Sequence, residues 1–285
     1  MKNGNSKVKV ARLSIASNTL LIIMKLTVGI ISGSVSIISE AIHSGMDLIA
    51  AVIAYVSVKL SDNPPDKGHP YGHGKIENIS GVIEALLIFI AAALIIIEAV
   101  KKLTGEGGKL EVIGLGAVVM FISALVNFYV SRKLYKVAKQ TKSIALEADA
   151  LHLKTDVYTS LGVAVGLALI YFTGITWLDP IVAIMVALMI VYESFRLLRK
   201  AFTPLIDTCW SKEEECALVE KLNEMGVHYH DLRTRTAGNY KFLDLHIEIP
   251  KEQSVGEAHQ YCDFIEDELC KSFENLSVIT HVEPK

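Results

Sequence analysis

Six apolar runs occupy most of the first 200 residues of this 285-residue chain. Each is long enough to cross the hydrocarbon of a bilayer as a helix, which takes about 20 residues. Hydrophobic residues make up 51% of the chain, and its mean hydropathy is +0.40. The sequence therefore predicts a polytopic α-helical membrane protein with six transmembrane helices. The expected spans are 11–32, 36–60, 79–103, 112–135, 144–172 and 178–198.

Charge and hydropathy change together near Asp207. Residues 208–285 contain 8 Lys and Arg against 16 Asp and Glu, whereas residues 1–207 contain 20 against 15. We therefore expect a transmembrane domain over residues 1–207 and an acidic domain outside the membrane over residues 208–285. An acidic domain disfavours nucleic acid as a partner and favours cations.

The distribution of basic residues predicts the orientation of the chain. Cytoplasmic loops carry an excess of Lys and Arg, so both termini are expected in the cytoplasm and the protein in the cell membrane. The inner-side residues include Lys2, Lys7, Lys9, Arg12, Arg132, Lys133, Lys136, Lys139, Lys142, Arg196, Arg199 and Lys200, and the outer side has only Lys101, Lys102 and Lys109. No cleaved signal peptide is evident.

Two expected spans each contain a histidine followed four residues later by an aspartate. The pairs are His43 with Asp47 and His152 with Asp156. Residues four apart share a helix face, and both pairs fall about 12 to 18 Å into the membrane at 1.5 Å per residue. Two imidazoles and two carboxylates suit tetrahedral Zn²⁺. The alternative is a pair of hydrogen bonds that join helices.

Other polar residues lie in or near the spans, and of these Glu84, Glu98 and Asn127 have no assignable role from the sequence. Glu40 and Asp149 each precede one of these histidines by three residues. They could orient an imidazole or line a solvated vestibule, and the sequence favours neither. Lys25 is expected to extend its amine outward from its span.

The loop after the second span offers a further oxygen and two nitrogens. It reads "SDNPPDKGHPYGHGKIENIS", whose prolines and glycines exclude a continuous helix. Asp66, His69 and His73 could form an open metal site, or the loop could simply be polar.

The segment after residue 208 predicts a small two-layer domain. "SKEEECALVEKLNEMG" and "SVGEAHQYCDFIEDELCKSF" are typical of helices, and "HYHDLRTRTAG", "YKFLDLHIEI" and "SVITHVEP" of strands. The expected order is α-β-β-α-β. The four cysteines all lie here and form no CxxC pair, which fits a reducing compartment.

Most of the remaining histidines lie in these elements. His230, His246, His259 and His281, with Glu283, could bind zinc between the sheet and a helix or across a dimer interface. Scattered surface histidines are the alternative, and the part played by His228 stays open.

The motifs "SEAIHSGMDL", "HPYGHGKIE", "EADALHLKTD", "LDPIVAIMVAL" and "HDLRTR" resemble the cation diffusion facilitator family, and the resemblance runs from end to end. It implies a homodimer, six spans per subunit and a cytoplasmic metallochaperone-like domain. It also implies proton-coupled efflux of divalent metal by alternating access, and no enzymatic activity. The implied metal ligands are His43, Asp47, His152 and Asp156 in the membrane, Asp66, His69 and His73 in the loop, and His230, His246, His259, His281 and Glu283 in the cytoplasmic domain.

The transported ion is expected to be Zn²⁺, because two imidazoles count against Mn²⁺, which prefers oxygen. A broader exporter of Fe²⁺, Mn²⁺, Co²⁺ or Cd²⁺ is the nearest alternative. A membrane metal sensor that transports nothing is another. A membrane metalloprotease would need a motif such as His-Glu-x-x-His, which does not occur in this sequence.

Overall fold

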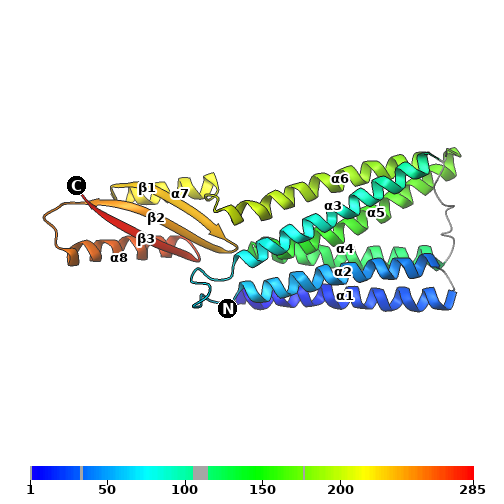
Figure 1. Ribbon diagram of the computed structural model, residues 1–285, viewed down its shortest axis with the longest axis horizontal. Helices are drawn as coiled ribbons and strands as arrows, with labels where there is room; N and C mark the ends of the chain where they lie inside the picture. The colour runs from blue at the N-terminus through cyan, green and yellow to red at the C-terminus, as the bar shows by residue number, and fades with distance from the viewer. Residues whose placement is uncertain (1, 33–34, 105–114, 176) are drawn as a thin grey trace. The chain divides into compact units, whose positions relative to one another are not determined.

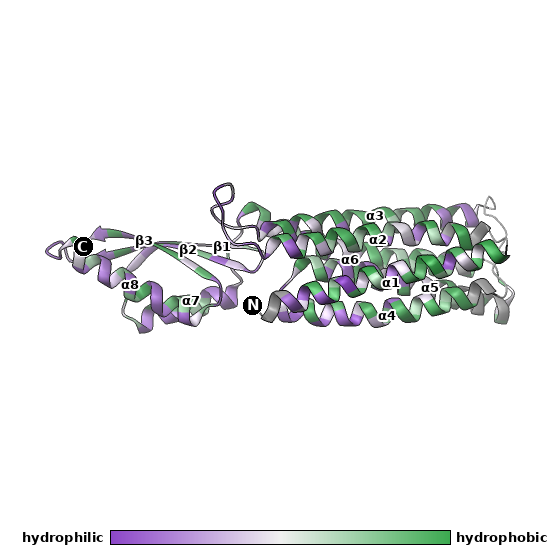
Figure 2. Ribbon diagram, turned by 90° about the horizontal axis from the view of Figure 1, so that it is seen from below, coloured by the Kyte–Doolittle hydropathy of each residue, from purple (hydrophilic) through white to green (hydrophobic). Residues whose placement is uncertain are grey.

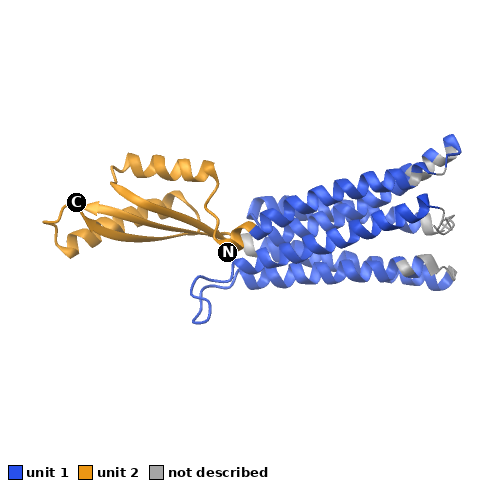
Figure 3. Ribbon diagram, turned by 45° about the horizontal axis from the view of Figure 1, so that its top comes forward, with its two compact units in different colours: residues 1–202 blue, residues 203–285 orange. Residues whose placement is uncertain are grey.

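The structure is a computed structural model of the 285-residue chain, and it describes residues 2–32, 35–104, 115–175 and 177–285. The start of the expected fourth span, at residue 112, and Lys109 lie outside these ranges. The chain divides into two units, residues 1–202 and 203–285, shown separately in Figure 3.

The first unit consists of six long helices (Figure 1). Five have segments long and apolar enough to span a membrane, and the remaining one, α5, is 30 residues long but carries several charged residues in its first half. Apolar residues occur along all of these helices (Figure 2), and many large ones are exposed in the chain by itself, as expected for a bundle surrounded by lipid. The prediction of six helices is confirmed. Their bounds are α1 Lys2–Ser32, α2 Val35–Ser61, α3 Lys75–Leu103, α4 Leu115–Thr141, α5 Ile144–Thr173 and α6 Leu178–Phe202.

Helix α5 is the central helix of this unit, because it contacts α2, α3, α4 and α6. Small residues allow some of these helices to approach closely. A Cβ atom on Gly81 of α3 would lie 2.6 Å from Ile144 Cγ2 and 3.0 Å from Ala201 Cβ. Asp149, His152 and Thr155 of α5 are buried inside the bundle, where several helices surround them.

The second unit is the expected α/β domain, in the predicted order α-β-β-α-β after a short 3₁₀ turn. Strand β2 lies between antiparallel β1 and parallel β3. Ser211 caps α7, and Ser254 forms a capping box with Glu257 at the start of α8. The elements are η1 Thr203–Ile206, α7 Lys212–Glu224, β1 Tyr229–Ala237, β2 Tyr240–Ile249, α8 Val255–Ser272 and β3 Leu276–Pro284.

The two faces of the sheet differ because side chains alternate along a strand. Leu243, Leu245 and Ile247 of β2 are almost fully buried and pack with core residues of α7 and α8. Burying each such side chain contributes about 1.5 to 3 kcal/mol. The residues between them, including His246, therefore lie on the face that these helices leave open.

Candidate functional site

The structure brings together the two His-x-x-x-Asp pairs predicted from the sequence. Ligand atoms of His43, Asp47 and Asp156 all lie within 4.8 Å of one another. His152 Nε2 lies 3.1 Å from Asp47 Oδ1, and both residues are buried. Adjacent ligands on a tetrahedral Zn²⁺ are separated by about 3.4 Å, given metal–ligand bonds near 2.1 Å. We call these four residues the tetrad. Its spacing is similar to that of the ligands around such an ion.

Neighbouring asparagines contact the tetrad. Asn127 of α4 donates its side-chain N–H to Asp156 Oδ2 at 3.2 Å, and Asn18 of α1 donates to the backbone carbonyl of Asp47 at 3.5 Å. The sequence showed Asn127 to be an intramembrane polar residue but gave no sign of its partner. It fixes the orientation of one carboxylate from a third helix.

One charged neighbour of the tetrad, Lys25, does not lie where the sequence predicted. Lys25 is 5% exposed and does not extend outward. Its Nζ donates to Ser44 Oγ at 2.8 Å and lies 3.4 Å from Glu40 Oε2. The prediction was wrong because α2, which packs on α1, supplies polar partners to the amine. Glu40 therefore pairs with a lysine, whereas Asp149 accepts a hydrogen bond from Ser14 Oγ.

The loop residues Asp66, His69 and His73 also come together, with ligand atoms within 4.8 Å of one another. His73 Nε2 lies 3.4 Å from Asp66 Oδ2, and the two imidazole centroids are 4.4 Å apart. The pKa of Asp66 is lowered, chiefly because its carboxylate accepts the backbone N–H of His69. The side chains of Asp66 and His69 are exposed, so a metal ion in solution can reach them.

The sheet of the second unit carries the third group on its open face. His230, His246 and His281 occupy adjacent positions across β1, β2 and β3, in register. Glu283 joins two of them, with Oε1 3.0 Å from His246 Nδ1 and Oε2 3.3 Å from His230 Nε2. The separations suit tetrahedral zinc. The side chains of His230, His246 and Glu283 are therefore suitable ligands for a zinc ion.

The histidine cluster and His259 do not lie as the sequence predicted. The expectation that the cluster lies between the sheet and a helix is wrong, because the histidines share the face opposite the α7 and α8 core. His259, on α8, contacts Asp263 instead of the other histidines.

Two further residues lie near the cluster in the sequence. His228 precedes β1 and is exposed. Asp231, which the sequence did not suggest, lies 3.6 Å from His246 Nε2 because a bulge follows His230.

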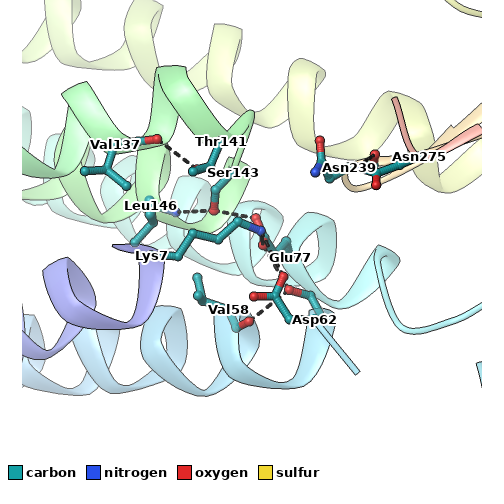
Figure 4. A network of polar contacts seen from close by, with 11 residues as sticks. Lys7, Val58, Asp62, Glu77, Val137, Thr141, Ser143, Leu146, Asn239 and Asn275 are labelled. Carbon is teal, nitrogen blue, oxygen red and sulfur yellow. Dashed lines mark hydrogen bonds and ion pairs between the residues drawn. The ribbon is translucent and has the colours of Figure 1, made fainter. Parts of the chain in front are cut away.

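A buried ion-pair network ties together the bundle end at which α1, α3 and α5 begin (Figure 4). Lys7 Nζ lies 3.0 Å from Glu77 Oε1 and 3.1 Å from Asp62 Oδ1. Ser61 and Ser143 each donate a hydroxyl to the Glu77 carboxylate. We call these five residues the Lys7 cluster. It joins α1, the end of α2, α3 and the start of α5.

Six long helices with a His–Asp tetrad between α2 and α5, and an appended α/β domain that carries a cluster of histidines, are characteristic of integral membrane proteins that move cations. The cation efflux transmembrane domain model matches residues 11–206, and the model for the cation efflux protein cytoplasmic domain matches residues 211–285. The chain belongs to the cation diffusion facilitator family, which confirms the resemblance seen in the sequence motifs.

Several relatives match along most of their length. The uncharacterized transporter sll1263 of Synechocystis is 35% identical over 96% of this chain and 89% of its own. The cation-efflux pump FieF of Shewanella oneidensis is 29% identical over 96% of this chain and 93% of its own. A solved structure from work on CzrB, described there as a candidate zinc transporter, is 35% identical over 27% of this chain and 98% of its own, with a TM-score of 0.24.

Proposed function

We propose that this cation efflux transporter exports Zn²⁺ in exchange for protons, by alternating access. The observation that carries the proposal is the tetrad, in which two imidazoles and two carboxylates from α2 and α5 converge within one bundle. Imidazole nitrogen suits Zn²⁺, whereas Mn²⁺ prefers a site made of oxygen. The relatives named above as cation transporters support the coarser part of this assignment.

Proton coupling follows from the chemistry of the ligands. His43 and His152 can bind metal only through a deprotonated nitrogen, so protons and metal compete for the same atoms. Histidine changes charge between about pH 5 and 8, the range across which a proton gradient operates. Protons arriving from the far side would release the metal and be carried inward when the empty site returns.

The direction of transport depends on orientation. The distribution of basic residues supports a cytoplasmic position for the beginnings of α1, α3 and α5. The Lys7 cluster then closes the cytoplasmic end of this conformer, because it joins four helices at that end. Opening toward the cytoplasm requires that the cluster separate, as one part of the bundle moves against another.

The acidic domain supports a proposal of a homodimer stabilised by zinc. Each copy carries a surplus of acidic residues, so two copies repel one another until cations bind. His230, His246 and Glu283 would hold the ion from one copy. A zinc ion bound there supplies positive charge between the two domains and raises the population of the dimer. His259, remote from these ligands within one chain, is free to contribute from a second copy.

Zinc uptake into proteoliposomes under an opposing pH gradient tests the function. We expect wild-type protein to move Zn²⁺ with proton counterflow, and His152→Ala to lose at least about 100-fold in rate. His228→Ala is the matched control, because His228 is exposed and takes part in none of the three ligand groups. His43→Asp should raise the rate for Mn²⁺ relative to Zn²⁺. Zinc binding by wild-type protein without flux would instead identify a sensor.

A further inference from the structure

Two acidic residues deep in the bundle have no place in the sites described so far. Glu84 of α3 and Asp149 of α5 are each 0% exposed. Each has one oxygen near a serine hydroxyl, with Ser80 donating to Glu84 at 3.4 Å and Ser14 donating to Asp149 at 3.2 Å. Their other oxygens, Glu84 Oε2 and Asp149 Oδ2, have no hydrogen-bond partner among the described residues.

The geometry places these two acids at one level of the bundle. Helices α3 and α5 begin at the same end, where Ser143 contacts Glu77. Glu84 lies seven residues beyond Glu77, and Asp149 six beyond Ser143, which gives rises of about 10.5 and 9 Å. The helices approach closely between these levels, at Gly81 and Ile144. The two carboxyl groups therefore lie at similar depths on helices that contact one another.

The same helical rise relates the acids to the tetrad. His152 and Asp156 lie three and seven residues beyond Asp149 on α5, or about 4.5 and 10.5 Å farther from the Lys7 cluster. Glu84 and Asp149 therefore lie between the Lys7 cluster and the tetrad, on the cytoplasmic side under the proposed orientation. We call them the lower pair.

Two carboxylates cannot remain uncompensated in such a place. Burying a single unpaired charge costs several kcal/mol, so each acid needs a compensating cation or proton there. The unpartnered oxygen of each acid marks where positive charge is needed. The two carboxyl groups and the serine hydroxyls beside them offer only oxygen ligands, which suit Zn²⁺ less well than imidazole nitrogen does. A cation bound here can pass on to the tetrad.

We infer that Glu84 and Asp149 form a second intramembrane site, which binds the transported divalent cation in transit between the cytoplasmic end and the tetrad. The inference rests on the proposed function. It assigns cation binding to residues outside the His-x-x-x-Asp motifs. The cation would bind first to oxygen ligands of the lower pair and then to the nitrogen and oxygen ligands of the tetrad.

Glu84→Gln tests the inference, with Glu98→Gln on the exposed face of the same helix as the matched control. Both variants would be reconstituted at equal density, and zinc uptake measured over a range of Zn²⁺ concentrations. Zinc affinity of the tetrad would be measured in parallel by calorimetry, on protein in which His246→Ala weakens the cytoplasmic site. We expect Glu84→Gln to lower the maximal rate at least about tenfold while tetrad affinity stays within about twofold of that in the control. Glu84→Asp should recover part of the rate.

The possible results separate the inference from the proposed function. Failure of wild-type protein to transport would overturn the function itself. An unchanged maximal rate in Glu84→Gln, with normal wild-type transport, would overturn only the transit site. A parallel loss of tetrad affinity would make Glu84 a packing residue. A normal zinc rate with loss of zinc-driven proton movement would assign the lower pair to protons.

Asp149→Asn gives a second, independent measurement should the Glu84 variants fail to fold. It removes the other carboxylate of the lower pair and keeps the size of the side chain. We expect it to lower the maximal rate as Glu84→Gln does, and the double variant to cost little more than either single change, because one site is lost in each case. Effects that multiply in the double variant would show two unrelated roles and overturn the inference.

Discussion

Replacing Lys7 with methionine should destabilise the bundle far more than a comparable change at an exposed ion pair. The Lys7 and Glu77 side chains are each 4% exposed, whereas Asp62 is 39% exposed. A buried hydrogen bond to a charged group contributes about 1.5 to 3 kcal/mol, and a half-exposed pair about 0 to 1 kcal/mol. Glu77 keeps two hydroxyl donors in the variant, Ser61 and Ser143, so it is not left without partners.

The expected loss for Lys7→Met is therefore about 2 to 4 kcal/mol in the free energy of unfolding. Lys200→Met is the control, because Lys200 also bonds a glutamate on another helix, Glu147, but is 55% exposed. That change should cost no more than about 1 kcal/mol. Reversible unfolding in lipid bicelles would measure both. A double-mutant cycle with Glu77→Gln should give a coupling of at least about 1.5 kcal/mol. Equal losses in the two lysine variants would refute the reasoning.

Three further predictions follow from other parts of the molecule. Because turn N–H groups hold the pKa of Asp66 below its ordinary value, its carboxylate stays ionised between pH 7 and 5. Asp66→Asn removes that charge and should therefore weaken Co²⁺ binding by the loop throughout this pH range, as followed by absorption spectroscopy. In monomeric protein, His246→Ala should weaken zinc binding by the cytoplasmic domain at least about 100-fold and His259→Ala less than about threefold, by calorimetry. Gly81→Ala should cost about 1 to 3 kcal/mol on unfolding, whereas Gly45→Ala, whose added methyl meets nothing within 4 Å, should be neutral or stabilising.

Much of the candidate site could be predicted because it depends on short-range periodicity. A spacing of four on a helix brings His43 beside Asp47, and the regular rise gave both pairs a similar depth. A period of two likewise assigned His246 to the face opposite Leu245. These rules depend only on local backbone geometry, so the positions that they predict agree with the structure.

Contacts between helices could not be predicted in the same way. The partners of Lys25, and the approach of Glu84 to Asp149, depend on how one helix is rotated and shifted against another. Asp231 reaches His246 only through a bulge with a positive φ of 46°, which the residue pattern alone did not indicate. These features arise from packing, and a single sequence specifies packing less directly than it specifies the face of one helix.

The Lys7 cluster also bears on how fast the protein can work. A transporter that closes its cytoplasmic end with these bonds must break and remake them in every turnover. If the step that opens this end limits the cycle, about 3 kcal/mol held in the cluster slows it about 150-fold. Under the proposed function, the same bonds would keep that end shut while the site faces the other way, and so would limit leakage of protons. The chain would then exchange maximal speed for tight coupling, and a weakened cluster should give a faster transporter that leaks more protons.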